Sequence, residues 1–106
     1  MPTVIEFLDA RIDEDVAEAS AYAVLRFDPQ RGYPVYQGVQ ARVLAECETK
    51  RRIMKTAMTL LDEGRRDREY GSPWPGVPLD GRAAKILYLL ALPYADHPDY
   101  DEAWRP

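Results

Sequence analysis

The chain has 106 residues, of which 46% are hydrophobic and 30% charged, the mixture expected of one small soluble domain spanning residues 1–106. Its net charge of −4 argues against a general affinity for nucleic-acid backbone, which needs a basic face. A single cysteine, the lack of an apolar run of about 18 residues and an acidic start without a signal-peptide pattern predict a cytoplasmic protein with neither an internal disulfide nor a membrane span.

A long helix is the first element that the sequence predicts, from Thr3 to about Arg26. Thr3 and Glu6 have the spacing of a capping box, in which each side chain accepts the other residue's backbone N–H. An apolar stripe at near-heptad spacing follows, formed by Ile5, Leu8, Ile12, Ala19 and Tyr22. A helix of this length in so small a chain is expected to pack antiparallel to a second helix or to extend into a partner.

The segment from Phe27 to Gly38 is predicted to connect two helices, because Asp28-Pro29 and Arg31-Gly32 are turn sequences. A short strand at Tyr33–Tyr36 would need a partner strand, and the sequence pattern identifies none.

The second helix is predicted from Val39 to Glu63, with Gly64 as its C-cap. Its stripe has the same near-heptad spacing as the first, and is formed by Leu44, Cys47, Arg51, Met54, Met58 and Leu61. After it, residues 71–79 hold three prolines and two glycines, which predicts a loop.

The third helix is predicted from Gly81 to Leu92, with Asp80 as N-cap and Pro93 as its stop. It contains the most apolar run of the chain, Ile86–Leu92, and is expected to be buried on most sides. A short C-terminal helix, capped by Asp96 or His97, should end near Trp104. The predicted fold is therefore all-α: a small helical bundle of two long antiparallel helices, a buried third helix and a short C-terminal helix.

One polar residue interrupts each long stripe, Asp15 in the first helix and Arg51 in the second. If the helices pack antiparallel, both residues lie near the middle of the seam. This position predicts a structural Asp15–Arg51 ion pair, or one with Glu14 in place of Asp15, which would set the register of the two helices. The alternative is a wider stripe with both residues solvated at its edge.

The aromatic residues are the candidates for an interface or a pocket, since Trp and Tyr dominate binding hot spots. They are Trp74, Tyr33, Tyr36, Tyr88, Tyr94 and Trp104. Tyr88, Tyr94 and Trp104 are expected to hold the tail on the third helix, or else to remain exposed as part of an interface. A pocket under the Trp74 loop would be lined by Tyr33, Tyr36 and Tyr88.

Two charged groups suggest other chemistry. The basic segment Lys50–Lys55 is a candidate for contacting nucleic acid, but consecutive helical residues point to different faces, so a solvated helix surface is preferred. The acidic tail is a candidate for a cation site, although helix capping accounts for most of it: Asp96, His97, Asp99, Asp101 and Glu102. Cys47 lies on an apolar stripe and is expected to be buried and inert. No catalytic motif is found, so neither an enzyme nor a cofactor is expected.

Three blocks of sequence carry a resemblance: ALPYADHPDYDEAWRP at 91–106, ARVLAECETKRRIM at 41–54 and ARIDED at 10–15. Together they resemble a family of small uncharacterised proteins from actinobacteria and their phages, and the C-terminal block is the most specific of the three. The family has no established activity, so the resemblance implies no catalytic residue.

The long stripes, the apolar content and the lack of a recognisable site favour a small protein-interaction or regulatory accessory protein of phage or host, with a homodimer as one form. The alternatives are a small-molecule or nucleotide binder with a pocket under the Trp74 loop, and a nucleic-acid binder acting through Lys50–Lys55.

Overall fold

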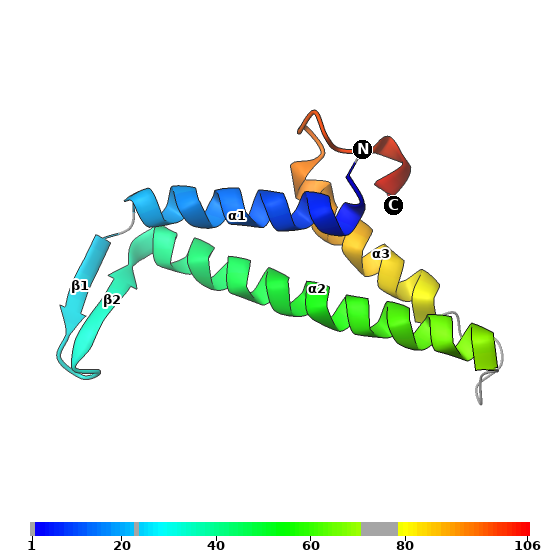
Figure 1. Cartoon of the computed structure of the whole chain (residues 1–106). Coiled ribbons are helices and arrows are strands. Elements are labelled where there is room, and N and C mark those ends of the chain that lie inside the picture. The colour runs from blue at the N-terminus through cyan, green and yellow to red at the C-terminus, as the bar shows by residue number, and fades with distance from the viewer. Residues whose placement is uncertain (1, 23, 71–78) are drawn as a thin grey trace.

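The computed structural model describes residues 2–22, 24–70 and 79–106, with side chains except at positions 24, 36–37, 67–70, 79 and 80. The elements in chain order are α1 (Val4–Tyr22), β1 (Val24–Asp28), β2 (Tyr33–Gln37), α2 (Gly38–Tyr70), α3 (Leu79–Ala91) and two 3₁₀ turns, η1 (Leu92–Tyr94) and η2 (Glu102–Trp104). The predicted antiparallel arrangement of α1 and α2 is confirmed (Figure 1). Helix α3 packs on α2 and reaches α1, near the point where the two chain termini meet.

The molecule is elongated, with extents of 54 × 35 × 17 Å and a radius of gyration of 17.7 Å. A compact domain of this length has a radius of gyration of about 13 Å. The difference arises because α2 is about 50 Å long and α1 only about 29 Å. At the other end of the molecule, the β-hairpin projects beyond the helices (Figure 1).

Helix α1 starts with the predicted capping box. The Thr3 backbone N–H donates to Glu6 Oε1 at 3.1 Å, and the Glu6 backbone N–H donates to Thr3 Oγ1 at 3.2 Å. The helix ends at Tyr22 rather than at the predicted Arg26, because the chain continues as a strand.

The hairpin corrects the all-α prediction. Strands β1 and β2 pair antiparallel, with Leu25 opposite Tyr36 and Phe27 opposite Pro34. The possible strand at Tyr33–Tyr36 therefore finds its partner in residues 24–28, of which the sequence assigned 24–26 to the first helix and 27–28 to the connection. The turn is held by Asp28, whose Oδ1 accepts the Gln30 N–H at 2.8 Å. Gly32 closes it at φ +77°, a conformation that side chains with a Cβ disfavour.

Helix α2 begins one residue before the predicted Val39 and runs past Gly64 to Tyr70, so Gly64 is not its C-cap. Gly64 is buried. A glycine inside a helix costs only about 1 kcal/mol relative to alanine, which packing on its covered face can outweigh.

Helix α3 contains the predicted apolar segment up to Ala91. The expectation that this helix is buried on most sides is wrong. Ala83, Leu87 and Ala91 are buried on one face, whereas Leu89 is 50% exposed and Leu92 is exposed beyond the end of the helix. The segment is thus an ordinary amphipathic helix whose apolar surplus remains partly in water. The side chain of Asp80, the predicted N-cap, is not among those described.

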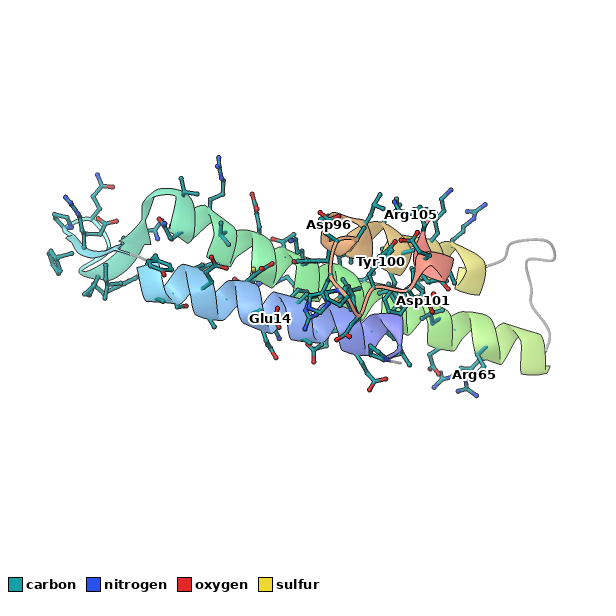
Figure 2. All side chains as sticks on the ribbon, turned by 90° about the horizontal axis from the view of Figure 1, so that it is seen from above. Glu14, Arg65, Asp96, Tyr100, Asp101 and Arg105 are labelled. Carbon is teal, nitrogen blue, oxygen red and sulfur yellow. The ribbon has the colours of Figure 1, made fainter. Side chains whose placement is uncertain are left out.

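The tail is mostly turns, and its last helix is shorter than predicted. The 3₁₀ turn η2 begins at Glu102, and its N-cap is Asp101, whose Oδ1 accepts the Ala103 N–H at 2.9 Å. Neither Asp96 nor His97 caps a helix. Figure 2 shows the tail, with Asp96, Tyr100, Asp101 and Arg105 labelled, crossing over α1 and α3.

The tail completes the core. The buried cluster joins α1, α2, α3 and the tail through Phe7, Leu8, Ile12, Cys47, Met54, Ala57, Leu87, Ala91, Tyr100 and Trp104. Phe7 is central to it, because its ring lies 5.2 Å from the Trp104 ring, 5.6 Å from His97 and 5.9 Å from Tyr100, centroid to centroid. The first two helical turns and the last residues of the chain therefore stabilise each other.

The capping box yields a test. Replacing Thr3 by Ala should lower the free energy of unfolding by about 1 kcal/mol, because the Glu6 backbone N–H loses its acceptor. Urea unfolding followed by far-UV circular dichroism measures this loss, and an unchanged midpoint would contradict it.

The same motif predicts a pH dependence. The Thr3 backbone N–H, and then its side chain, lower the pKa of Glu6 below its ordinary 4.5. The stability that ionised Glu6 supplies is therefore complete above pH 4.5 and is lost as the pH falls through the lowered value. The free energy of unfolding of a Glu6→Gln variant should accordingly approach that of the wild type as the pH falls through the lowered pKa of Glu6.

Candidate functional site

Arg11 is the one charged residue buried among the described residues, at 8% exposure. Its Nη2 donates to Glu14 at 2.9 Å and its Nη1 donates to Nε2 of the His97 ring, whose Nδ1 accepts the Asp99 N–H. The guanidinium carbon lies 5.2 Å from the centre of the Phe7 ring. Arg11 therefore joins α1 to the turn of the tail by charge-assisted hydrogen bonds and a cation–π contact.

Tyr94 forms a second link between three elements. Its hydroxyl donates to Asp15 Oδ2 at 2.6 Å and accepts a hydrogen bond from Lys50 Nζ at 3.0 Å. The ammonium of Lys50 also lies 5.1 Å from the centre of the Tyr94 ring. Burial, and then the hydrogen bond to Asp15, raise the pKa of Tyr94 above its ordinary 10.0. The hydroxyl thus holds α1, α2 and η1 together in its protonated form.

The predicted Asp15–Arg51 ion pair is replaced by other partners. Arg51 binds Asp13 and lies 3.6 Å from Asp9, both one helical turn apart on the outer side of α1. Glu14, the predicted substitute for Asp15, pairs with Arg11 at 2.9 Å. The physical reason is that Asp15 lies on the side of α1 that meets Tyr94, whereas the half-exposed Arg51 reaches the rim of the seam. Such exposed pairs contribute little to stability.

Most of the basic segment Lys50–Lys55 is engaged within the protein. Lys50 bonds Tyr94, Arg51 binds Asp13, and Arg52 pairs with Glu48 at 2.8 Å. The cations of this segment therefore spread around α2 instead of forming one basic face.

The acidic tail is used for turns. His97 Nδ1 accepts the Asp99 N–H at 3.0 Å, Asp101 caps η2, and Glu102 pairs with Arg105 at 2.8 Å. Within the part of the chain that the structure describes, no three His, Cys, Asp or Glu side chains are grouped to hold a metal ion. Cys47 is buried as predicted, and burial, followed by the charge of Asp15, raises the pKa of its thiol, which disfavours the reactive thiolate.

The aromatic candidates separate to different parts of the molecule. Trp104 is buried and Tyr94 and Tyr88 are half-buried against the core, as expected for residues that hold the tail. Tyr33 lies in the hairpin and Tyr88 in α3, which Figure 1 shows well apart, so they do not line one pocket. Trp74 lies outside the described residues, and the side chain of Tyr36 is not among those described.

The hairpin end carries the most exposed apolar side chains. Phe27 is 63% exposed, Tyr33 56% and Leu25 55%, and Tyr22 and Val39 at the adjoining helix ends are exposed too. Leu25 and Phe27 alternate with Arg26 and Asp28 along β1, which places the two apolar residues on one face of the strand. Tyr33 pairs with Asp28 and therefore lies on the other face of the hairpin. We call Leu25 and Phe27 the hairpin patch. It is the candidate functional site.

The comparison with known families supports the part of the resemblance that concerns an uncharacterised family. The model of a family of unknown function, DUF6221, matches residues 1–106. The chain belongs to this family. No curated protein and no solved structure matches it. Among the described helices of this DUF6221 protein, none has both the length and the apolar character needed to cross a bilayer.

The sequence patterns missed four of the residues that matter most. Phe7 and Arg11, four residues apart, form a second stripe of α1 beside the one at Leu8 and Ile12, and the presence of an arginine concealed it. Leu25 and Phe27 belong to an alternating apolar–polar segment, which is the signal of a strand; the adjoining alanine-rich helix concealed that signal.

The buried arginine predicts a measurable loss. Arg11→Met keeps most of the side-chain volume but removes the hydrogen bonds to Glu14 and His97, so the free energy of unfolding should fall by about 1–3 kcal/mol. The matched control is Arg66→Met, which removes a surface pair with Asp62 and should change stability by no more than about 0.5 kcal/mol. Equal losses in urea unfolding would contradict a special role for Arg11.

Tyr94→Phe tests the second link. The variant keeps the ring but loses the hydroxyl, so stability at neutral pH should fall by about 1 kcal/mol, and the loss should not add to that of Asp15→Asn. Because the folded pKa of Tyr94 is raised, its contribution is complete below pH 10.0 and is lost as the pH rises further. The difference between variant and wild type should therefore shrink in alkali, and additive losses would show that the two side chains do not interact.

Proposed function

We propose that this protein acts by binding another protein chain through the hairpin patch, and that the chain it binds is a second copy of itself. The observation that carries the proposal is a two-stranded hairpin with an exposed apolar face, projecting from the helices (Figure 1). A two-stranded hairpin is marginally stable alone in water, and three or more strands are usually needed. Pairing with a second hairpin would supply them.

The exposed area supports a partner. The chain exposes 7556 Å², whereas a compact monomer of its 12.1 kDa is expected to expose about 6,000 Å². The surplus is about 1,500 Å², and a standard interface buries about 800 Å² on each partner. An elongated molecule therefore has enough surface for a stable dimer while the rest of it stays solvated.

The two edges of the hairpin differ in a way that selects β1. Strand β2 contains Pro34, which has no N–H, and a proline in a sheet is placed where its missing donor would face away from the paired strand. The outer edge of β2 thus lacks a donor. Strand β1 has no proline among its five residues, so its outer edge keeps every N–H. An open, apolar edge strand of this kind is a template for pairing with another chain.

The charges of β1 favour self-pairing. Arg26 and Asp28 flank Phe27, so two β1 strands that pair antiparallel about Phe27 would place Arg26 opposite the second copy's Asp28. Opposite charges across a strand pair are stabilising. Arg26 has no ion pair within the described part of the chain, whereas Asp28 has the Arg31 guanidinium at 3.6 Å. Such an interface is isologous, the commonest form of homodimer.

The other expectations stay predictions. They are a regulatory accessory role, a cytoplasmic location, and an origin in actinobacteria or their phages. A regulatory role would follow if dimerisation controlled access to the hairpin patch, because a monomer would present the same open edge to other chains.

The test uses matched leucines. Leu25→Asp should raise the dissociation constant of the dimer by about 30-fold or more, because it introduces a charge into the apolar face of the interface beside Phe27. Leu89→Asp, on α3, is the control, since Leu89 is exposed to a similar extent at 50% against 55%. Sedimentation equilibrium measures both variants, and circular dichroism confirms that they fold. A wild-type chain that stays monomeric at high concentration would overturn the proposal, as would an equal effect of the two substitutions.

A further inference from the structure

A cleft of about 280 Å³ lies between the second half of α1 and the first turns of α2. Asp15, Glu18 and Tyr22 line it from α1, and Val39, Gln40 and Val43 line it from α2. The cleft adjoins the hairpin but is separate from the face formed by Leu25 and Phe27. The hydrogen bond from Tyr94 engages one oxygen of Asp15, and among the described residues no cation forms an ion pair with either carboxylate of the cleft.

Two carboxylates line this cleft, and neither forms an ion pair with a cation in the part of the chain that the structure describes. Asp15 is half-buried, and only its Oδ2 is engaged, by the Tyr94 hydroxyl. Glu18 forms no hydrogen bond or ion pair within the described ranges 2–22, 24–70 and 79–106. Lys50, on α2 nearby, donates to the Tyr94 hydroxyl and is not within ion-pair distance of Asp15. Because residues three apart lie on one side of a helix, the negative charges of Asp15 and Glu18 both face the cleft.

The remaining walls are suited to an apolar stem. Ala19 is buried at the base of the cleft and Val43 is half-buried. Tyr22 and Val39 are exposed, and their side chains are available to an incoming group. An aromatic ring attracts a cation over its face, and valine packs against methylene groups. A group with a positive head and an apolar stem satisfies both parts of the site, whereas an anion would be repelled.

We propose that this cleft binds an alkylguanidinium or alkylammonium group, with the charged head at Asp15 and Glu18 and the stem along Val43 and Tyr22. The inference is independent of the proposed dimer, since it rests on a different set of side chains. The same chemistry is offered by a small free cation and by an arginine or lysine side chain of another protein. The experiment therefore includes a probe for each source.

The first probe is agmatine, a free alkylguanidinium, followed by two-dimensional amide NMR. Saturable shifts are expected at the amides of Glu18, Tyr22, Val39 and Gln40. Butyrate, which has an apolar stem and the opposite charge, should cause none. The second probe is a blocked Gly-Arg-Gly peptide, which carries the guanidinium on a backbone. Tighter binding of the peptide would assign the cleft to a protein side chain, and binding of agmatine alone would assign it to a free cation.

Two variants decide whether the carboxylates are responsible. Glu18→Gln should weaken binding of the better probe by at least about threefold, because one charge of the pair is lost. Glu63→Gln makes the same change of net charge on α2, about 35 Å away along the helix, and should leave binding unchanged. The proposal is overturned if neither probe gives saturable shifts, if butyrate matches agmatine, or if the two variants behave alike. The dimer constant of each variant, measured alongside, keeps this outcome separate from the fate of the proposed dimer.

Discussion

The structure depends on the contact between Phe7 and the last residues of the chain. Phe7 lies on the first helix, and the rings of Tyr94, His97, Tyr100 and Trp104 surround it from more than 80 residues away in sequence. The contacts with Tyr94, His97 and Tyr100 are edge-to-face, and aromatic pairs of this kind contribute about 0.5–1.5 kcal/mol each beyond the area that they bury. The tail has little regular structure of its own, so this ring is what gives it a defined position.

The polar interactions reinforce the same junction. Arg11 binds His97 one helical turn after Phe7, and Asp15 binds Tyr94 one turn further on. One face of α1 therefore meets the tail with an aromatic ring, a cation and an anion in succession. Each polar residue contacts a different part of the tail. These contacts fix the position of the tail along α1, which apolar packing alone would not specify. The outer pair of Arg51 and Asp13 adds less, because both side chains are largely solvated.

The molecule is divided into a closed end and an open end. At the closed end α3 and the tail cover α1 and α2, and the large buried side chains gather there. At the open end the hairpin and the adjoining turns of α1 and α2 carry exposed aromatic and aliphatic residues. Figure 2 shows the two ends in one view, with the tail over the helices and the hairpin beyond them. Both proposed binding sites lie at the open end, because side chains that are not packed in the core are available to contact a ligand or a partner.

The sequence by itself determined the features that depend on neighbours along the chain. These are the antiparallel pair of long helices, the capping box of Thr3 and Glu6, the turn at Asp28, and the burial of Cys47. Periodicity and capping arise from residues three or four positions apart, so a single sequence carries their signal.

Only the tertiary structure decided the features that depend on distant partners. Residues 24–28 became a strand because Tyr33–Gln37 pairs with them, and α2 passed through Gly64 because that face is covered. Phe7 and Arg11 became central because the tail folds back across 80 residues onto them. Local propensities of about 1 kcal/mol are too small to settle such choices, since burial and pairing contribute as much or more once the distant segment arrives.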